Sequence, residues 1–202
     1  MKFILGKKVI MTQTFSEDGR VHPVTLVEAG PLFVTQVKTP EKDGYSAVQV
    51  GFGTRKEKTL NKAQKGHFKG AGPFMHLGEF RTNADSPLKV GDQINVSVFS
   101  QGDSVAVSGI SKGKGFQGGV KRHGFHGGPR THGQKHSERE PGSIGGGLRT
   151  RVPKGMRMAG RMGGDRITVK NLKIVNIDSD KNLLYIEGAV PGRKGTVLEI
   201  KG

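Results

Sequence analysis

Residues 111–164 read SKGKGFQGGVKRHGFHGGPRTHGQKHSEREPGSIGGGLRTRVPKGMRMAGRMGG, and this stretch decides how the chain is organised. It holds 16 glycines, 12 lysines or arginines and four histidines against two acids, so it carries +10 of the formal charge of +16. Its few apolar residues follow neither a helical period nor a strand period. Glycine loses the most backbone entropy on folding and like charges repel, so we expect this segment alone to stay disordered in water.

The two flanks of this segment have the composition of a folded domain. Outside residues 111–164 the chain has 21 lysines and arginines against 15 acids, together with enough valine, isoleucine, leucine and phenylalanine for a modest core. A length of 202 residues favours one domain with an elaboration over two full domains. We therefore expect a folded domain built from 1–110 and 165–202, which carries 111–164 as an extended finger.

The folded part is predicted to be mainly β. Alternating or β-rich runs separated by turns that contain glycine, proline or aspartate predict strands over 8–15, 21–29, 32–38, 45–52, 75–81, 93–99, 104–110, 166–177, 182–187 and 196–200. A short helix is predicted over 60–68, inside a basic insertion at about 54–74. Many short strands with little helix indicate a closed or nearly closed β-barrel.

The charge and composition restrict the partners. A pI of about 10.3 favours a polyanion, with nucleic acid first and an anionic membrane surface second. The chain has no cysteine, which excludes disulfides, thiolate chemistry and a cysteine-based zinc site. No apolar run approaches 18 residues, and the N-terminus lacks the pattern of a signal peptide. We expect a cytoplasmic protein that does not bind membranes, because it also lacks an amphipathic helix with a broad apolar face.

The basic side chains are the candidate RNA contacts, because lysine and arginine neutralise phosphates and release counterions. The stretch 54–70, TRKEKTLNKAQKGHFKG, has six basic residues and one acid, although a solvated basic helix face is an alternative interpretation. Unliganded histidines in such a context bind phosphate or stack on bases. The predicted contacts are Arg55, Lys56, Lys58, Lys62, Lys65, Lys69, Lys112, Lys114, Lys121, Arg122, His123, His126, Arg130, His132, Lys135, Arg139, Arg149, Arg151, Lys154, Arg157 and Arg161.

One motif in the finger resembles a dinucleotide-binding loop. Residues 113–118, GKGFQG, match GxGxxG and follow a predicted strand. The dinucleotide fold needs an amphipathic helix to open there, whereas the sequence that follows is interrupted repeatedly by glycine and proline. We interpret these glycines instead as positions where the backbone comes close to phosphates and sugars.

Signals for catalysis or for a metal are weak. His123, His126, His132 and His136 cluster in sequence, but no cysteine or well-placed acid accompanies them. Glu138 and Glu140 lie among basic residues, where salt bridges are the simpler interpretation. There is no GxxxxGK[ST] phosphate loop. We therefore expect no enzyme activity, no metal, no cofactor and no small-molecule substrate.

Several long motifs resemble the bacterial form of the large-subunit ribosomal protein three family. They are GKGFQGGVKRHGFHGGPRTHG over 113–133, PGSIG over 141–145 and MAGRMG over 158–163, and ILGKKVIMTQTF, VQVGFG and RITVKNLKIV also fit. The resemblance covers essentially the whole chain in order. It implies a six-stranded barrel similar to the second domain of translation elongation factors, with a finger that enters the large-subunit (23S-type) ribosomal RNA.

The resemblance also implies a function. Family members bind ribosomal RNA early in assembly of the large subunit, near the 3′ region of that RNA, and contact neighbouring ribosomal proteins. Their finger points toward the peptidyl transferase centre, and here its tip corresponds to Ser143, Ile144, Gly145, Gly146 and Gly147.

The tip departs from the family pattern in one respect. Some bacterial relatives carry a methylated glutamine after PGSIG, whereas this chain has Gly146 there. Two other classes of protein compete with the ribosomal interpretation. The first is a barrel fragment of a translation GTPase or other enzyme, which needs a phosphate loop or paired carboxylates. The second is a basic protein of an anionic membrane surface.

Overall fold

The structure is a computed structural model that describes residues 2–68, 71–82, 88–147 and 150–202. The chain forms two compact units. The first, here called the barrel unit, comprises Met1–Ile110 and Arg166–Gly202, and the second, here called the basic unit, is Ser111–Asp165.

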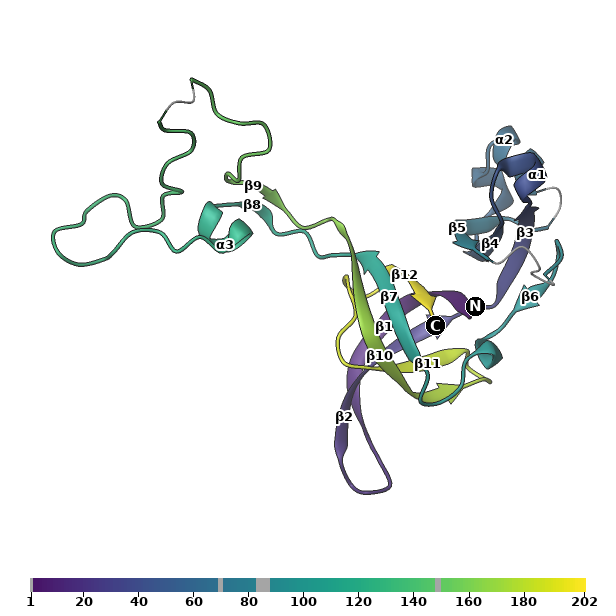
Figure 1. Cartoon of the computed structure of the whole chain (residues 1–202). Helices are drawn as coiled ribbons and strands as arrows, with labels where there is room; N and C mark the ends of the chain where they lie inside the picture. Colours follow the sequence, from purple (N-terminus) through teal and green to yellow (C-terminus); the bar gives the residue numbers. More distant parts are fainter. Residues whose placement is uncertain (1, 69–70, 83–87, 148–149) are drawn as a thin grey trace. The chain divides into compact units, whose positions relative to one another are not determined.

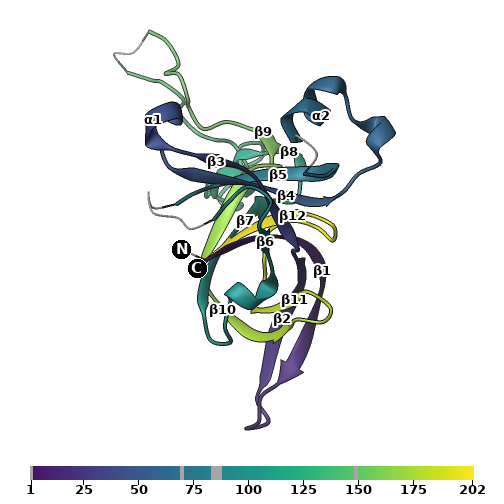
Figure 2. The same ribbon diagram turned by 90° about the vertical axis from the view of Figure 1, so that its right-hand side faces the viewer.

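Six strands of the barrel unit close into a barrel in the order β1-β12-β7-β10-β11-β2 (Figures 1 and 2). Every neighbouring pair is antiparallel. Because the barrel is closed, each strand has hydrogen-bond partners on both sides over part of its length. The predicted six-stranded barrel is confirmed. Its strands are β1 Phe3–Phe15, β2 Val21–Ala29, β7 Ser104–Ile110, β10 Arg166–Asp178, β11 Leu183–Glu187 and β12 Val197–Lys201.

Period-2 alternation places one face of β12 and of β11 inside the barrel. In β12, Leu198 and Ile200 are buried, whereas the residues between and beside them are half-buried. β11 repeats this pattern with Leu184 and Ile186. A short strand needs only two or three inward aliphatic side chains to fill a barrel of this size, and a chain with a low apolar fraction can supply them.

A second sheet lies outside the barrel and contains the four predicted strands that a six-stranded barrel leaves over. It has the order β5-β4-β3-β6, with β3 Leu32–Lys38, β4 Ala47–Thr54, β5 Phe74–Arg81 and β6 Gln93–Ile94. This sheet shares one hydrophobic core with the barrel. The ring of Phe80 stacks on that of Phe3 with centroids 4.4 Å apart, which joins β5 to β1. Sequence periodicity identifies strands but not their partners, so it did not separate the two sheets.

The strand predicted over 93–99 is wrong beyond residue 94. A 3-10 turn, Val96–Val98, follows β6. Val96 and Phe99 are both buried, and the Phe99 N–H donates to the Val96 carbonyl oxygen at 3.0 Å. A strand would bury Val96 with Val98 instead. A helical turn buries residues that are three positions apart, because the turn brings both side chains to one face.

The insertion between β4 and β5 contains a 3-10 turn at Glu57–Thr59 and the helix α2, Lys62–Phe68, which confirms the predicted short helix. Asn61 starts α2, because its side-chain oxygen accepts the Gln64 N–H at 2.7 Å while the Gln64 side chain accepts the Asn61 N–H at 3.3 Å. Phe68 then packs into a second small hydrophobic cluster with Leu60 and Phe74. A further short helix, α1 Pro40–Asp43, lies where a polar turn was predicted.

A hydrogen-bonded cluster ties β3 and β5 of the outer sheet to the bend that precedes β4. The Lys38 ammonium group donates to Glu79 at 2.5 Å and to the Tyr45 hydroxyl at 2.7 Å, and Tyr45 donates to Glu79 at 2.7 Å. The hydrogen bond from Lys38 is the main cause that lowers the pKa of Glu79, followed by the one from Tyr45.

We expect Phe80→Ala to destabilise the barrel unit by about 3–5 kcal/mol, because it removes a fully buried ring that stacks on Phe3 and leaves a cavity between the two sheets. The measurement is urea unfolding of the full chain. Phe116→Ala is the matched control, because that ring is 76% exposed and its loss should change stability by less than about 0.5 kcal/mol. Equal midpoints for both variants would contradict the shared core.

Candidate nucleic-acid interface

The base of the basic unit is a regular two-stranded sheet. β8, Gly115–Gln117, pairs antiparallel with β9, Gly160–Met162. The Ser111 N–H donates to the Asp165 carbonyl oxygen, and the Lys114 N–H to that of Met162, each at 2.9 Å. The sequence predicted no regular structure here, and that was wrong for the base. Backbone hydrogen bonds between two antiparallel arms need no hydrophobic periodicity, so periodicity did not reveal them.

The helix α3, Gly119–His123, follows β8 directly and corrects the expectation that glycine and proline exclude a helix after GKGFQG. It has only five residues and ends at Gly124 in a left-handed conformation. This single turn is much shorter than the helix that carries a dinucleotide pyrophosphate.

Arg122 and His123, two of the predicted RNA contacts, lie on α3 and bond to the backbone of the protein itself. The Arg122 guanidinium group donates to the Met158 carbonyl oxygen at 2.7 Å, and Nε2 of His123 lies 3.0 Å from the same oxygen. Both side chains are half-buried. They connect the outgoing arm of the unit to the returning arm, which sequence spacing of 35 or 36 residues could not indicate.

Two glycines of the basic unit are needed for contacts within the protein. At Gly127, with φ of +75°, an added Cβ would overlap the Glu138 carbonyl oxygen. At Gly163, with φ of +76°, it would overlap the Lys112 carbonyl oxygen. Close approach of the two arms therefore explains these two glycines.

The other predicted contacts that the structure describes are exposed. Among them Arg130 forms an ion pair with Glu138 at 3.5 Å, which confirms a salt bridge for that acid. Lys69 and Arg149 lie outside the described residues. The exposed residues are Arg55, Lys56, Lys58, Lys62, Lys65, Lys112, Lys114, Lys121, His126, Arg130, His132, Lys135, Arg139, Arg151, Lys154, Arg157 and Arg161.

A hollow of about 660 Å³ lies within the basic unit, and its lining includes His123, His126, Glu140 and Arg157. The remaining lining is largely glycine and proline. Arg157 is the one cation and Glu140 the one acid of this lining, beside the two imidazole rings. The glycines of an open hollow permit close approach of a segment of phosphate backbone.

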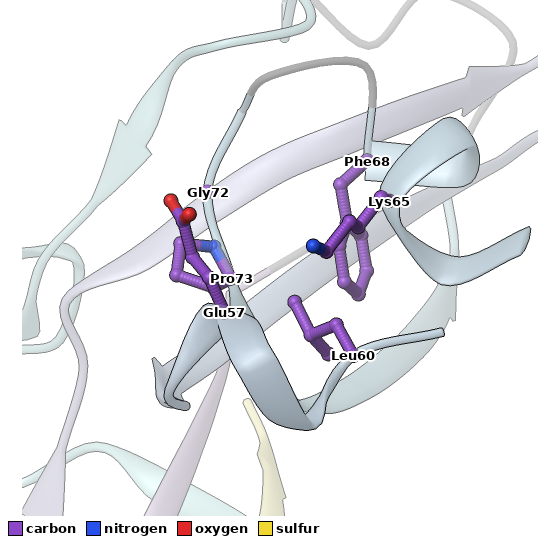
Figure 3. A pocket seen from close by; sticks show the side chains of 6 residues that line it. All are labelled: Glu57, Leu60, Lys65, Phe68, Gly72 and Pro73. Atoms are coloured by element: carbon purple, nitrogen blue, oxygen red, sulfur yellow. The ribbon is translucent and has the colours of Figure 1, made fainter. Parts of the chain in front are cut away.

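The insertion of the barrel unit holds a smaller hollow of about 230 Å³ (Figure 3). Leu60, Phe68 and Pro73 form its apolar wall, and the charged ends of Lys65 and Glu57 lie at its sides (Figure 3). It is smaller than the roughly 300–1,000 Å³ of typical small-molecule sites. We therefore regard it as the outer surface of the cluster around Phe68, surrounded by exposed cations.

The predicted tip is a bend held by a serine. The Gly146 N–H donates to Ser143 Oγ at 3.2 Å, and Gly147 has a φ of +85°. Gly145 is half-buried, and a Cβ there would lie 3.3 Å from the Arg151 carbonyl oxygen. The tip residues supply backbone, one hydroxyl group and the partly exposed side chain of Ile144.

Neither a metal cluster nor a membrane-spanning helix is found in the described part of the chain. No group of three or more histidine, cysteine, aspartate or glutamate side chains is arranged to hold an ion among these residues. None of the helices described is long and apolar enough to cross a bilayer.

A closed barrel with a separate, densely cationic unit defines a class of basic β-proteins suited to a polyanionic partner. The family model of ribosomal protein L3 matches residues 84–183. The chain is 51% identical to the large ribosomal subunit protein uL3 of Finegoldia magna, over all of this chain and 97% of that protein. It is 52% identical to the protein of the same name from Carboxydothermus hydrogenoformans, over 99% of this chain and 96% of that protein. The chain belongs to the ribosomal protein L3 family.

We expect Arg122→Ala to loosen the base of the basic unit, because it removes the charged donor that joins α3 to Met158. Amide hydrogen exchange of Gly115–Gln117 in the full chain should accelerate by about tenfold, which corresponds to about 1.4 kcal/mol. Lys121→Ala, at the exposed neighbouring position, is the control and should leave exchange unchanged. Identical rates in both variants would show that Arg122 does not connect the arms.

Proposed function

We propose that this protein is a structural constituent of the large ribosomal subunit that binds 23S-type ribosomal RNA directly. The observation that carries the proposal is the concentration of exposed cations on the basic unit and on the insertion at about 54–74, in a chain of the ribosomal protein L3 family. Lysine and arginine contact phosphates there, and glycine allows close approach of the backbone. The protein acts in the cytoplasm, in the ribosome.

The barrel unit and the basic unit have different roles in this proposal. The barrel provides a folded anchor that buries most of the apolar side chains, while the basic unit completes its ordering when RNA supplies the counter-charge. Such a protein can bind early in assembly of the large subunit, because its anchor folds without RNA. Neighbouring ribosomal proteins are the remaining partners.

The basic unit forms the finger directed toward the peptidyl transferase centre, with Ser143–Gly147 at its tip. Two basic runs, 112–139 and 149–161, form the outgoing and returning arms. The tip has no side chain for acid–base chemistry, so its influence on the centre acts through shape and packing against RNA. The protein is therefore not an enzyme, and it takes no cofactor, metal or small-molecule substrate.

The two competing classes require features that differ from those described. A GTPase fragment or other enzyme requires a phosphate loop or paired carboxylates, and the sequence has neither pattern. A protein of the membrane surface requires an amphipathic helix with a broad apolar face, whereas α2 buries only Phe68. Crosslinking to cellular RNA with position mapping discriminates among them, because reads confined to large-subunit RNA support the ribosomal role.

Binding to large-subunit RNA should weaken steeply with salt, on the order of a thousandfold or more between about 50 and 200 mM. Replacing Lys121, Lys135 and Lys154 of the basic unit by alanine should reduce the slope of log K against log salt by about 2–3. The measurement is a filter-binding titration at several salt concentrations.

The matched control replaces three exposed lysines of the barrel unit, Lys42, Lys89 and Lys170, by alanine. Both triple variants lose the same net charge, so a general effect of charge would change the two slopes equally. The proposal requires that the variant of the basic unit lose more of the slope than the control. Equal slopes would contradict it.

Gly146→Trp should alter translation without unfolding the barrel. Gly146 has no left-handed φ and is exposed, and an added Cβ would lie 3.1 Å from Ser143 Oγ. A small shift of the serine side chain admits a large side chain, which then projects toward RNA at the tip. Ribosomes with the variant should differ from the parent in the rate of peptide-bond formation, or in sensitivity to drugs of the centre. Equal rates, equal sensitivity and equal chemical footprints would contradict placement of the tip near the centre.

A further inference from the structure

The far half of the β1–β2 hairpin extends beyond the barrel (Figures 1 and 2). β1 pairs with β12 only up to Lys7, and the last backbone bonds on that side join Lys8 to Thr196 and Gly195. In the described part of the chain, residues 10–15 pair with β2 alone. Residues 10–15 of β1 therefore form an open edge, toward which every second residue directs its unpaired N–H and C=O groups.

Beyond the β-bulge between Lys8 and Ile10, this edge lacks the protection that exposed edges of sheets usually carry. Charged side chains, proline, glycine bulges or a covering segment normally prevent pairing with another chain. Residues 10–15 read IMTQTF, with no charge, no proline and no glycine. The opposite edge of the hairpin differs, because Pro23 has no N–H and its carbonyl oxygen accepts the Gly188 N–H at 2.7 Å. On the β2 side, Pro23 therefore interrupts the edge at the point where pairing with β11 ends at Val24.

One face of the same segment is apolar. The register places Phe15 opposite Val21 and Gln13 opposite Pro23, with Met11 next along this face. Phe15 is 64% exposed, Val21 52% and Met11 49%. Scattered exposed apolar residues are ordinary, but here three large ones share one face beside an open strand edge, with Gln13 between Met11 and Phe15.

The charge of the hairpin differs from that of the rest of the chain. Residues 10–26 contain Glu17 and Asp18 but only one cation, Arg20. The segment is therefore formally −1 in a chain of +16. RNA is repelled by such a segment, whereas a protein rich in lysine and arginine is attracted to it.

We propose that the far half of the β1–β2 hairpin, residues 10–23, is a docking surface for a basic protein of the same particle. The partner adds a strand to the open edge of β1, covers the apolar face around Phe15 and places its cations near Glu17 and Asp18. This inference rests on the proposed function only in that the partner is a component of the assembled large subunit.

The test uses assembled large subunits that contain the full chain with the photo-crosslinking residue p-benzoylphenylalanine in place of Phe15. The matched control carries it in place of Phe116, which is equally aromatic and more exposed but lies in the basic unit. After irradiation, the Phe15 position should yield an adduct that resists ribonuclease and contains a second protein with a basic pI. The Phe116 position should yield an adduct with RNA.

Every other outcome at Phe15 overturns the inference. An RNA adduct, no adduct, an acidic partner or a second copy of this chain each contradicts a basic partner protein. These failures are distinguishable from failure of the proposed function, because the RNA adduct at Phe116 reports RNA binding independently.

A pair of substitutions at Gln13 tests the sign of the partner's charge. Gln13 is exposed on the apolar face, so Gln13→Lys and Gln13→Glu change its charge in opposite directions. Combined with the probe at Phe15, Gln13→Lys should abolish most of the protein adduct, whereas Gln13→Glu should preserve it. Equal yields, or a greater loss with glutamate, would overturn the docking of a basic protein.

Discussion

The antiparallel pairing of β7 with β10 holds the two ends of the basic unit at neighbouring positions of one ladder. Arg166 lies opposite Ile110, so the chain leaves and re-enters the barrel unit at the same point. Closing a long loop costs conformational entropy, and here the barrel supplies that closure through buried residues such as Val107. The glycine-rich segment can therefore be carried without a hydrophobic core of its own.

Pairing continues from this ladder into the basic unit through backbone bonds and one cation. Ser111 bonds to Asp165, β8 pairs with β9, and Arg122 binds the returning arm at Met158. Not every cation in a basic segment thus serves RNA. Arg122 and His123 bond to the backbone of the protein itself, whereas lysines such as Lys121 are exposed.

Several strands were predicted from sequence with correct bounds, as at Val21–Ala29, Leu32–Lys38 and Ser104–Ile110. These strands alternate or are rich in β-forming residues and end at glycine, proline or polar turns, so local pattern and final structure agree. The strand over 93–99 failed because burial of Val96 and Phe99 comes from the surrounding core and not from local alternation. The division into a barrel and an outer sheet also required the pairing of distant segments.

The sequence by itself determined the mainly β class, the position of the cationic segment and the preference for a polyanionic partner, because composition, charge and short-range periodicity are properties of neighbouring residues. It also showed the family motifs. Only the tertiary structure decided which cations face solvent, which glycines are required by close approach of the arms, and that β1 has an open edge at residues 10–15. The physical reason is that exposure and strand pairing depend on residues far apart in the chain, whose contacts no local pattern records.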